Sequence, residues 1–454
     1  MASTYLTRTQ GTPTNVDKGT MSFWVKRGTL NKNNEYIIQN YIDGSNYGYI
    51  RWKSDNQLQV YSGGINDEKR TKMYFLDTTA WYHIVVRVDT SQSTANDRVR
   101  LYVNGEQISS SELDPNTNGG QNVDYDLFKS GGTMRIGYVS SGTATYFDGC
   151  LSHFHYCDGQ SYAPTEFGET DSTTGEWRIK TSPSVSYGSQ GFFILKDGNG
   201  ITDQSPNSND FTLGNGTLTK TEDCPSNIFN TFNVNVPSNS TTFSHGNTTL
   251  TSGSTQWNGA MTTIPLYGGK WYYECKYING GNIKFDVTGE KSDYSHMATL
   301  NSSYGGYNDN GYGYQFNNSG NDYIGNNDSF PNWGGGLSSN TGDKIFMIAL
   351  DLDNGKIWYG ADGTWFNDAS GNTGNPSAGT YAHQTISATH LAQKPFIVTG
   401  SLEGNSDVAH WNFGNGYFGT TAVSSAGNNA SGIGIFEYDV PTGFTAISTK
   451  GLNE

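Results

Sequence analysis

Short hydrophobic runs separated by glycine- and asparagine-rich turns recur along the whole chain. The run at residues 345–350 is almost unbroken and is bounded by polar residues, which is typical of a strand buried on both faces. Asn354-Gly355 then predicts a two-residue type I′ turn, because both residues tolerate positive φ. Residues 357–359 form the returning strand. We therefore expect a central hairpin, with sheet around it from residue 232 to 419.

The first part of the chain shows the same pattern with alternating apolar and polar positions. Strands at intervals of roughly 8 to 15 residues, joined by Gly/Asn turns, indicate an antiparallel sandwich and not βαβ units. The sequence predicts strands at residues 21–27, 36–40, 47–52, 58–61, 81–89, 98–103, 134–139 and 146–156.

Composition supports an all-β fold class, with two antiparallel β-sandwich (jelly-roll) domains. The 454 residues include 58 glycines and 29 tyrosines, and only 15% are charged. Tyrosine, threonine and valine favour strands, while glycine and asparagine favour turns. We expect no helix longer than two turns.

The net charge of −15 argues against nucleic acid and anionic membranes as partners, since both require a basic surface. The chain contains no apolar stretch of the ~20 residues that a membrane-spanning helix needs, and we expect no membrane insertion. Its N-terminus shows no apolar segment of a secretory signal. The four scattered cysteines do not indicate a disulfide scaffold.

The second half resembles SPRY domains in four motifs that occur in the expected order. These motifs are KWYYE at 270–274, GYGY at 311–314, GDKIFMIALDLDNGKIWY at 342–359 and HWNFG at 410–414. The resemblance implies a SPRY-like β-sandwich over residues 231–420, followed by a C-terminal tail at 421–454. That tail either packs on the second domain or mediates assembly.

The first half resembles laminin-G/concanavalin-like jelly rolls. The matching motifs are SFWV at 22–25, WYHI at 81–84 and RLYVNG at 100–105, together with the closing strand from 147 to 159. The resemblance implies a jelly roll over residues 1–168. Residues 169–230 are expected to be a partly ordered connector that either adds strands to this domain or bridges the two.

The connector motif DQSPNSNDFT and the tail GIFEYDVPTGFTAISTKGLNE resemble virion proteins of tailed, marine bacteriophages. This resemblance implies a surface component of the virion, such as a fibre, a tail-associated adhesin or a capsid decoration. Its expected partners are other virion proteins, further copies of itself on a symmetric particle, and host surface glycans.

A ligand site is predicted where aromatic and amide side chains cluster in loops of the second domain. Aromatic rings stack on the C–H faces of sugars, while Asn and Asp side chains hold sugar hydroxyls. The candidate residues are Tyr304, Tyr307, Asp309 and Trp333. The alternative is that such residues belong to the domain's own strands and core.

The segment CLSHFHYC at 150–157 was considered as a metal site. His153, His155 and Cys157 would share one face of a straight strand, about 6.8 Å apart per step, and would not converge on one ion. Asp351-Leu-Asp353 lacks the later ligands of a calcium loop. We predict no cofactor, with structural calcium as an alternative whose candidate ligands are Asp43, Asp124, Asp126 and Asp148.

Catalysis is not predicted. The compact carboxylate motif of concanavalin-like glucanases is missing, with Glu437 and Asp439 the nearest pair, and the histidines lie near no obvious nucleophile. The sequence therefore favours a non-enzymatic virion protein that presents loops for host binding. The alternatives are a structural cement protein without a host ligand, a polysaccharide depolymerase and a cellular peptide-binding SPRY protein.

Overall fold

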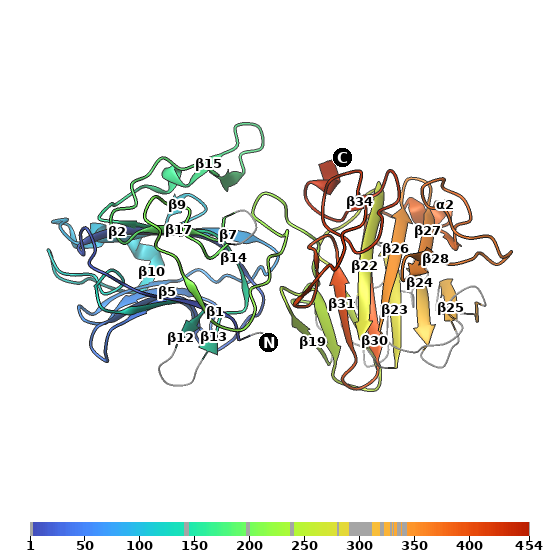
Figure 1. Cartoon of the computed structure of the whole chain (residues 1–454), viewed down its shortest axis with the longest axis horizontal. Coiled ribbons are helices and arrows are strands. Elements are labelled where there is room, and N and C mark those ends of the chain that lie inside the picture. The colour runs from blue at the N-terminus through green and yellow to red at the C-terminus, as the bar shows by residue number, and fades with distance from the viewer. Residues whose placement is uncertain are drawn as a thin grey trace. The chain divides into compact units, whose positions relative to one another are not determined.

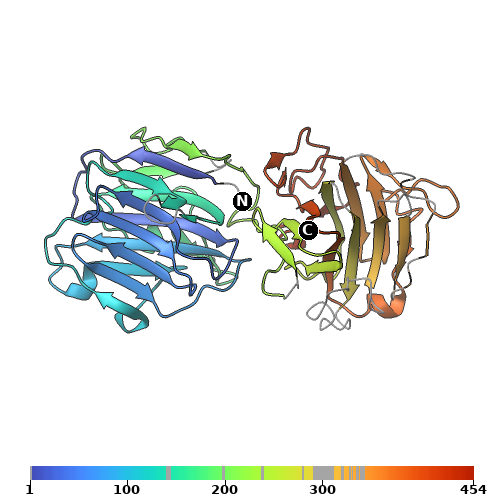
Figure 2. The same cartoon turned by 90° about the horizontal axis from the view of Figure 1, so that it is seen from below.

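The chain is almost entirely β-structure, as expected from its composition. The computed structural model describes residues 3–139, 145–196, 200–236, 240–278, 281–289, 311–317, 322–326, 329, 331–333, 337 and 343–453. The chain divides into two compact units (Figures 1 and 2), and each is built of facing antiparallel sheets. Unit 1 comprises residues 1–220 and 224–226, and unit 2 comprises residues 221–223 and 227–454. The all-β fold class is confirmed.

The first sheet of unit 1 will be called the tyrosine sheet. Its strands, in spatial order, are β10 (Leu113–Thr117), β6 (Asp67–Thr71), β5 (Leu58–Ser62), β4 (Tyr47–Trp52), β3 (Glu35–Tyr41), β11 (Thr133–Ile136), β1 (Tyr5–Thr9) and β18 (Thr212–Asn215).

The second sheet of unit 1 packs against the inner face of the tyrosine sheet. Its strands, in spatial order, are β17 (Phe192–Ile194), β14 (Gly149–Asp158), β2 (Lys18–Arg27), β7 (Trp81–Asp89), β8 (Val99–Val103) and β9 (Glu106–Gln107). Between the sheets lies one apolar core, which includes Phe23, Trp52, Ile84 and Phe154. Six of the eight strands predicted from the sequence are confirmed in position. The other two are each divided, 134–139 into strands at 133–136 and 138–139, and 146–156 into strands at 145–146 and 149–158.

The segment expected as a connector, residues 169–230, contributes strands to unit 1. The hairpin of β15 (Gly168–Thr170) and β16 (Trp177–Ile179) belongs to this unit, β17 pairs with β14, and β18 pairs with β1. In Figure 1 the β15 segment lies over the outer side of the β2–β7–β17 sheet. A further small sheet joins β12 (Tyr138–Val139) to β13 (Thr145–Tyr146), and short 3-10 turns occur at η1 (Ala95–Asp97), η2 (Ser110–Glu112) and η3 (Pro164–Glu166).

Unit 2 has a large sheet centred on β22 and β26. Its strands, in spatial order, are β19 (Thr241–Ser244), β20 (Thr249–Ser252), β31 (Val408–Asn412), β22 (Lys270–Ile278), β26 (Lys344–Asp351), β27 (Lys356–Ala361) and β28 (Thr364–Trp365), with β29 (Gln384–Thr385) beside β27 and β34 (Thr445–Ala446) parallel to β22.

The facing sheet of unit 2 closes its core. Its strands, in spatial order, are β21 (Trp257–Met261), β30 (Phe396–Glu403), β23 (Asn282–Gly289), β24 (Gly311–Asn317) and β25 (Asp322–Asn326). The remaining elements are β32 (Tyr417–Phe418), β33 (Thr421–Ala422), the single helical turn α2 (Ala388–Leu391) and η5 (Gly451–Asn453).

The central hairpin is confirmed, but its predicted turn is wrong. β26 pairs with β27 from Phe346 to Asp351, and Asp351 lies opposite Lys356, so residues 352–355 form the loop. Of the two residues predicted at positive φ, only Gly355 has it. The Asp351 carboxylate accepts the backbone N–H groups of residues 353 and 354 at 3.1 and 2.9 Å, which favours the longer loop over a type I′ turn.

Both faces of β26 are buried, as its apolar run predicts. Phe346, Ile348 and Leu350 face the core between the sheets. Met347 and Ala349 face a second apolar cluster, which the C-terminal segment completes with Phe436, Val440, Phe444 and Ala446. The tail therefore packs on the second domain, where it covers the outer side of the large sheet in unit 2. No helix found in the described residues has the length and apolar character to span a membrane.

Candidate functional site

The outer face of the tyrosine sheet carries a group of aromatic side chains, most of them half-buried. We call it the tyrosine face. It consists of five tyrosines and one arginine from β3, β4 and β5: Tyr36, Tyr41, Tyr47, Tyr49, Tyr61 and Arg51.

The alternation of side chains along each strand places this face on the side of the sheet away from the core. In β4, Ile50 and Trp52 point inward and are fully buried, so Tyr47, Tyr49 and Arg51 point outward. The neighbouring strand continues the pattern, because Tyr61 of β5 lies opposite Tyr49. Two adjacent strands thus place their tyrosines on one side.

A β-bulge brings Tyr36 of β3 onto the same face. The register shifts between Tyr36 and Ile38, and Ile37 and Ile38 are both fully buried. One extra residue on the core side allows Tyr36 and Gln39, three positions apart, to face outward together. Without the bulge, Tyr36 would point into the core.

The rings of the tyrosine face form a continuous contact network. Ring centroids are 5.0 Å apart for Tyr36 and Tyr49, 5.3 Å for Tyr49 and Tyr61, and 5.8 Å for Tyr47 and Tyr61. Tyr41 extends the group from β3, 6.5 Å from Tyr47. Contacts at these distances restrain the rings, so a ligand would meet a largely preformed surface.

Arg51 fixes the centre of the face. Its guanidinium lies 4.5 Å from the Tyr49 ring centroid and 5.1 Å from that of Tyr36. It donates hydrogen bonds to the Tyr36 hydroxyl at 2.7 Å and to Gln59 Oε1 at 2.6 Å. Gln59 in turn donates to Glu68 Oε1. The polar groups between the rings are therefore held in place by one another.

Three phenols of the face, those of Tyr36, Tyr49 and Tyr61, remain neutral at physiological pH. Burial raises the pKa of Tyr36, of Tyr49 and of Tyr61 above the ordinary tyrosine value. A neutral phenol both donates and accepts a hydrogen bond. Apart from Tyr49, which is 7% exposed, the five tyrosines are half-buried. The four half-buried tyrosines therefore each present part of their side chain to solvent, whereas Tyr49 is covered by its neighbours.

The ligand residues predicted from the sequence are not brought together in the described structure. Tyr304, Tyr307 and Asp309 lie outside the described residues. Trp333 is only 9% exposed, and its ring packs at 5.1 Å from His383, 5.9 Å from Phe366 and 6.1 Å from Tyr314. Trp333 thus belongs to the core of unit 2, and most of its ring is covered.

The strand that carries His153, His155 and Cys157 is not straight, which corrects its predicted geometry. The register of β14 against β2 shifts between Ser152 and His155, and His153 has a φ of 47°. His155 stacks on Phe193 at 3.9 Å and hydrogen-bonds the Tyr187 hydroxyl at 2.9 Å. Across the described residues, no group of three or more His, Cys, Asp or Glu side chains has the arrangement of a metal site.

Three of the four acids considered for calcium use their carboxylates within the protein. Asp126 accepts from Ser62 Oγ, from the Gly64 N–H and from Lys129 Nζ. Asp43 accepts the N–H groups of its own turn, and Asp148 accepts from Thr29 Oγ1. These donors compete with a cation for the carboxylate oxygens, and calcium binding stays a hypothesis.

Several histidines lie beside hydroxyls, contrary to the expectation from the sequence, and the most deeply buried of these pairs is His83 with Ser22. His83 Nε2 is 2.8 Å from Ser22 Oγ, and the Trp177 indole N–H donates to His83 Nδ1 at 3.0 Å. Because Nδ1 accepts, the proton of the neutral imidazole is on Nε2, which donates to Ser22. This tautomer cannot take a proton from the serine, and both residues are fully buried. The pair is therefore structural.

Sequence reasoning missed the tyrosine face, although its signal is present. Tyrosine or another polar residue occupies every second position of 47–52 and 58–61: Tyr47, Tyr49, Arg51, Gln59 and Tyr61. Alternation gives the outward side of each strand, but recognising a common site also requires the strand order β3–β4–β5 and the bulge after Tyr36.

Comparison with known proteins supports the concanavalin-like nature of unit 1. Residues 2–160 match the family described as the concanavalin A-like lectin/glucanases superfamily, Laminin_G_3. No curated protein matches the chain in sequence. The family match confirms the resemblance inferred from the motifs of the first half, and it identifies this part as a lectin/glucanase-like β-sandwich.

Solved structures with a similar fold include SPRY domains and a pentraxin. The TRIM65 PSpry domain has 11% identity and a TM-score of 0.30, covering 40% of this chain and 88% of that chain. The SPRY domain of human HERC1 has 14% identity and a TM-score of 0.27, covering 40% and 96%. A heptameric SAP-like pentraxin from Limulus polyphemus has 16% identity and a TM-score of 0.29, covering 47% and 89%.

Proposed function

We propose that this protein is a non-enzymatic carbohydrate-binding protein, and that the tyrosine face of unit 1 holds the sugar. The observation that carries the proposal is the restrained group of outward tyrosines with Arg51 and Gln59 between them. Its place in a lectin/glucanase-like β-sandwich supports the same reading.

The chemistry of the face suits a neutral glycan. Pyranose rings present C–H surfaces that pack on aromatic rings, and rigid aromatics supply contact area at low entropic cost. Phenol hydroxyls and the Glu68 carboxylate supply donors and acceptors for sugar hydroxyls, while the buried Gln59 amide holds Arg51 and Glu68 in place. The face extends over three strands that lie about 4.8 Å apart, which is room for an oligosaccharide and not only a single sugar.

We further propose that the chain acts on the surface of a phage particle as an adhesin or decoration protein. The resemblance of residues 203–212 and 434–454 to virion proteins of tailed phages supports this role. Many copies on a symmetric particle would raise the avidity of a weak single site. Cryo-electron microscopy of the particle would test it: a face buried against neighbouring subunits would favour the structural cement protein instead.

A glycan array with the full-length chain tests carbohydrate binding. We expect specific glycans to bind, and we expect Tyr47→Thr and Tyr61→Thr each to weaken that binding about tenfold, the loss of roughly 1.4 kcal/mol of ring contact. Threonine retains strand propensity at these half-buried positions. The matched control is Tyr267→Thr in unit 2, whose ring is 63% exposed and lies in the other unit.

Two results would overturn the proposal. One is an array on which no glycan binds above background while the thermal unfolding of the protein is normal. The other is glycan binding that survives both substitutions, which would place the sugar elsewhere.

A further inference from the structure

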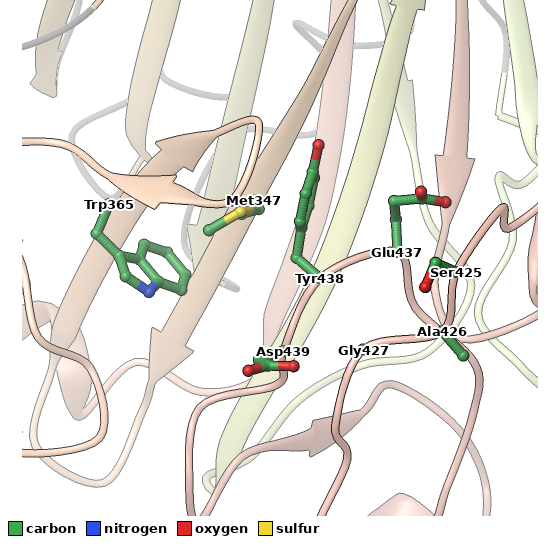
Figure 3. Close-up of a pocket in the computed structure, with 9 residues that line it drawn as sticks. Met347, Trp365, Ser425, Ala426, Gly427, Glu437, Tyr438 and Asp439 are labelled. Carbon is green, nitrogen blue, oxygen red and sulfur yellow. The ribbon is translucent and has the colours of Figure 1, made fainter.

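A second candidate site lies in unit 2, at the edge of the C-terminal cover over the large sheet. It is a pocket of about 610 Å³, shown in Figure 3. Its lining comes from β26, from β28 and the turn before it, and from two segments of the tail: Met347, Gly363, Trp365, Ser425, Ala426, Gly427, Glu437, Tyr438 and Asp439.

Two aromatic rings form opposite sides of this pocket. Figure 3 shows the buried Met347 between Trp365 and Tyr438. Both rings are half-buried and pack against the apolar cluster beneath the tail. Gly363 permits this arrangement, because a Cβ atom there would lie 3.1 Å from Cδ1 of the Tyr438 ring.

The outer wall is built from two tail segments held side by side. The Gly427 N–H donates to the Phe436 carbonyl at 2.9 Å, and the Val440 N–H donates to the Asn428 carbonyl at 2.8 Å. Gly427 allows the close approach, because a Cβ atom there would lie 2.2 Å from the Tyr438 carbonyl carbon. The wall therefore has a fixed geometry that does not depend on a ligand.

Carboxylates of this wall face the same pocket as the rings. Both carboxylate oxygens of Glu437 accept from Ser424, one from its backbone N–H at 2.7 Å and the other from its hydroxyl, and Asp439 Oδ1 accepts the backbone N–H of Asn428 at 2.6 Å. These bonds orient the two side chains. Oδ2 of the exposed Asp439 accepts no hydrogen bond from the described residues, so it is available to a ligand.

The local charge of the pocket is negative. After burial, the carboxylates of Asp362, Glu437 and Glu274 are the groups that raise the pKa of Tyr438. The lining residues include no lysine or arginine, and the nearby Lys344 is paired with Asp362 at 2.8 Å. A pocket with aromatic walls and carboxylates at its rim is complementary to an organic cation, which gains both cation–π and ionic contacts.

We propose that this pocket binds the cationic side chain of a lysine or arginine on a polypeptide partner. The aliphatic stem of such a side chain would lie along Met347 and the aromatic rings, and its charged group would reach Glu437 and Asp439. This site is separate in the fold from the tyrosine face and does not rest on the proposed carbohydrate binding. A neutral sugar is the competing ligand. It would stack on the rings and hydrogen-bond the carboxylates, but it would gain no ionic contact with them.

Saturation-transfer difference NMR on the full chain tests the proposal with a matched pair of probes. N-acetyl-arginine methylamide carries the cation, and N-acetyl-citrulline methylamide has the same shape without the charge. We expect signal on the side-chain methylenes of the arginine probe and about tenfold less with the citrulline probe. The signal should fall when NaCl rises from about 0.05 to 0.5 M, because the rim is open to solvent.

Variants then assign the signal to this pocket. Asp439→Asn and Trp365→Ala should each reduce it severalfold, whereas Asp55→Asn, an exposed acid in unit 1, removes the same charge and should leave it unchanged. Asp439 is exposed, so its variant should fold even if Trp365→Ala does not. Equal signals from both probes, or signal retained in Asp439→Asn, would overturn the proposal, and signal from methyl glycosides lost in Trp365→Ala would identify a sugar site instead.

Discussion

At the scale of single residues, Glu274 of β22 ties the C-terminal cover to the sheet. Its carboxylate is fully buried and accepts the backbone N–H groups of Glu437 and Tyr438, both at 2.9 Å. It also accepts from the Tyr272 hydroxyl at 2.9 Å and from Asn412 Nδ2 at 3.3 Å. Glu274 thus positions the outer wall of the pocket proposed to bind a cationic side chain, which we call the cation pocket.

Glu274 should make the stability of unit 2 depend on pH. Burial outweighs its hydrogen bonds and raises the pKa of Glu274 from 4.5 to about 7. Between these values the folded protein binds more protons than the unfolded chain, so the free energy of unfolding falls as pH rises from 4.5 to 7 and this contribution is constant above 7. The full change is on the order of 3 kcal/mol.

Calorimetry of the full chain checks this prediction by comparison with Glu274→Gln. The other titrating groups are shared, so the difference between the two proteins isolates Glu274. We expect the wild-type advantage in melting temperature to be larger at pH 5 than at pH 8. Glu106→Gln, at an exposed position of β9, is the control and should follow the wild type. A difference that does not vary with pH would contradict the assignment.

At the scale of elements, the β15–β16 hairpin shows how one aromatic residue anchors a short sheet. An isolated pair of short strands is marginally stable. Here Trp177 donates to His83 at 3.0 Å, and the His83 ring stacks on Trp24 at 4.8 Å. Gly105 and Gly168 leave room for the indole, since a Cβ atom on either would lie under 3.0 Å from its ring.

Trp177→Ala should release this hairpin and leave His83 Nδ1 without its donor. We expect a loss of about 2 to 4 kcal/mol of stability in unit 1. Hydrogen exchange should accelerate at residues 168–179 while β2 and β7 remain protected. Trp177→Phe keeps an aromatic ring but not the N–H group. Its stability and its exchange rate at residues 168–179 should lie between those of the wild type and Trp177→Ala. Unchanged exchange at 168–179 in Trp177→Ala would show that other contacts hold the hairpin.

The elements also show where sequence reasoning succeeds and where it cannot. Apolar alternation located β2, β4 and β7, because each has a face in the core. It missed β6, whose residues DEKRT are all polar, since Lys69 and Asp67 are buried as an ion pair at 3.0 Å. It missed β10 because Pro115 has no backbone N–H to donate to a neighbouring strand, which argues against a strand. Proline is tolerated here because β10 lies at the edge of the sheet.

For the candidate sites too, local alternation predicts which way a side chain points, but it does not predict which side chains meet. Alternation marks Tyr49 as outward, but only the register brings it opposite Tyr61, and only the bulge turns Tyr36 toward them. The cation pocket joins β28 to residues 425–439, which are far apart in the sequence and follow no period. Such long-range packing is set by tertiary contacts that a local pattern does not contain.

At the scale of the whole molecule, the two units have separate cores. The core of unit 1 contains residues from Leu6 to Phe211, and that of unit 2 contains residues from Phe232 to Ile447. No residue is shared between these clusters. Each unit should therefore fold without the other, and Glu274→Gln and Trp177→Ala should shift different calorimetric transitions.

Expression of fragments tests this independence and fixes the end of the first folding unit. Fragment 1–220 should unfold cooperatively at the temperature of the unit 1 transition in the full chain. Fragment 1–168 lacks β17, whose Phe192 and Ile194 are fully buried and which pairs with β14. Exposing these two side chains removes roughly 3 to 6 kcal/mol of hydrophobic stabilisation. This fragment should therefore melt many degrees lower or fail to fold. Equal melting temperatures for the two fragments would show that residues 169–220 are an attachment to the jelly roll and not a part of its core.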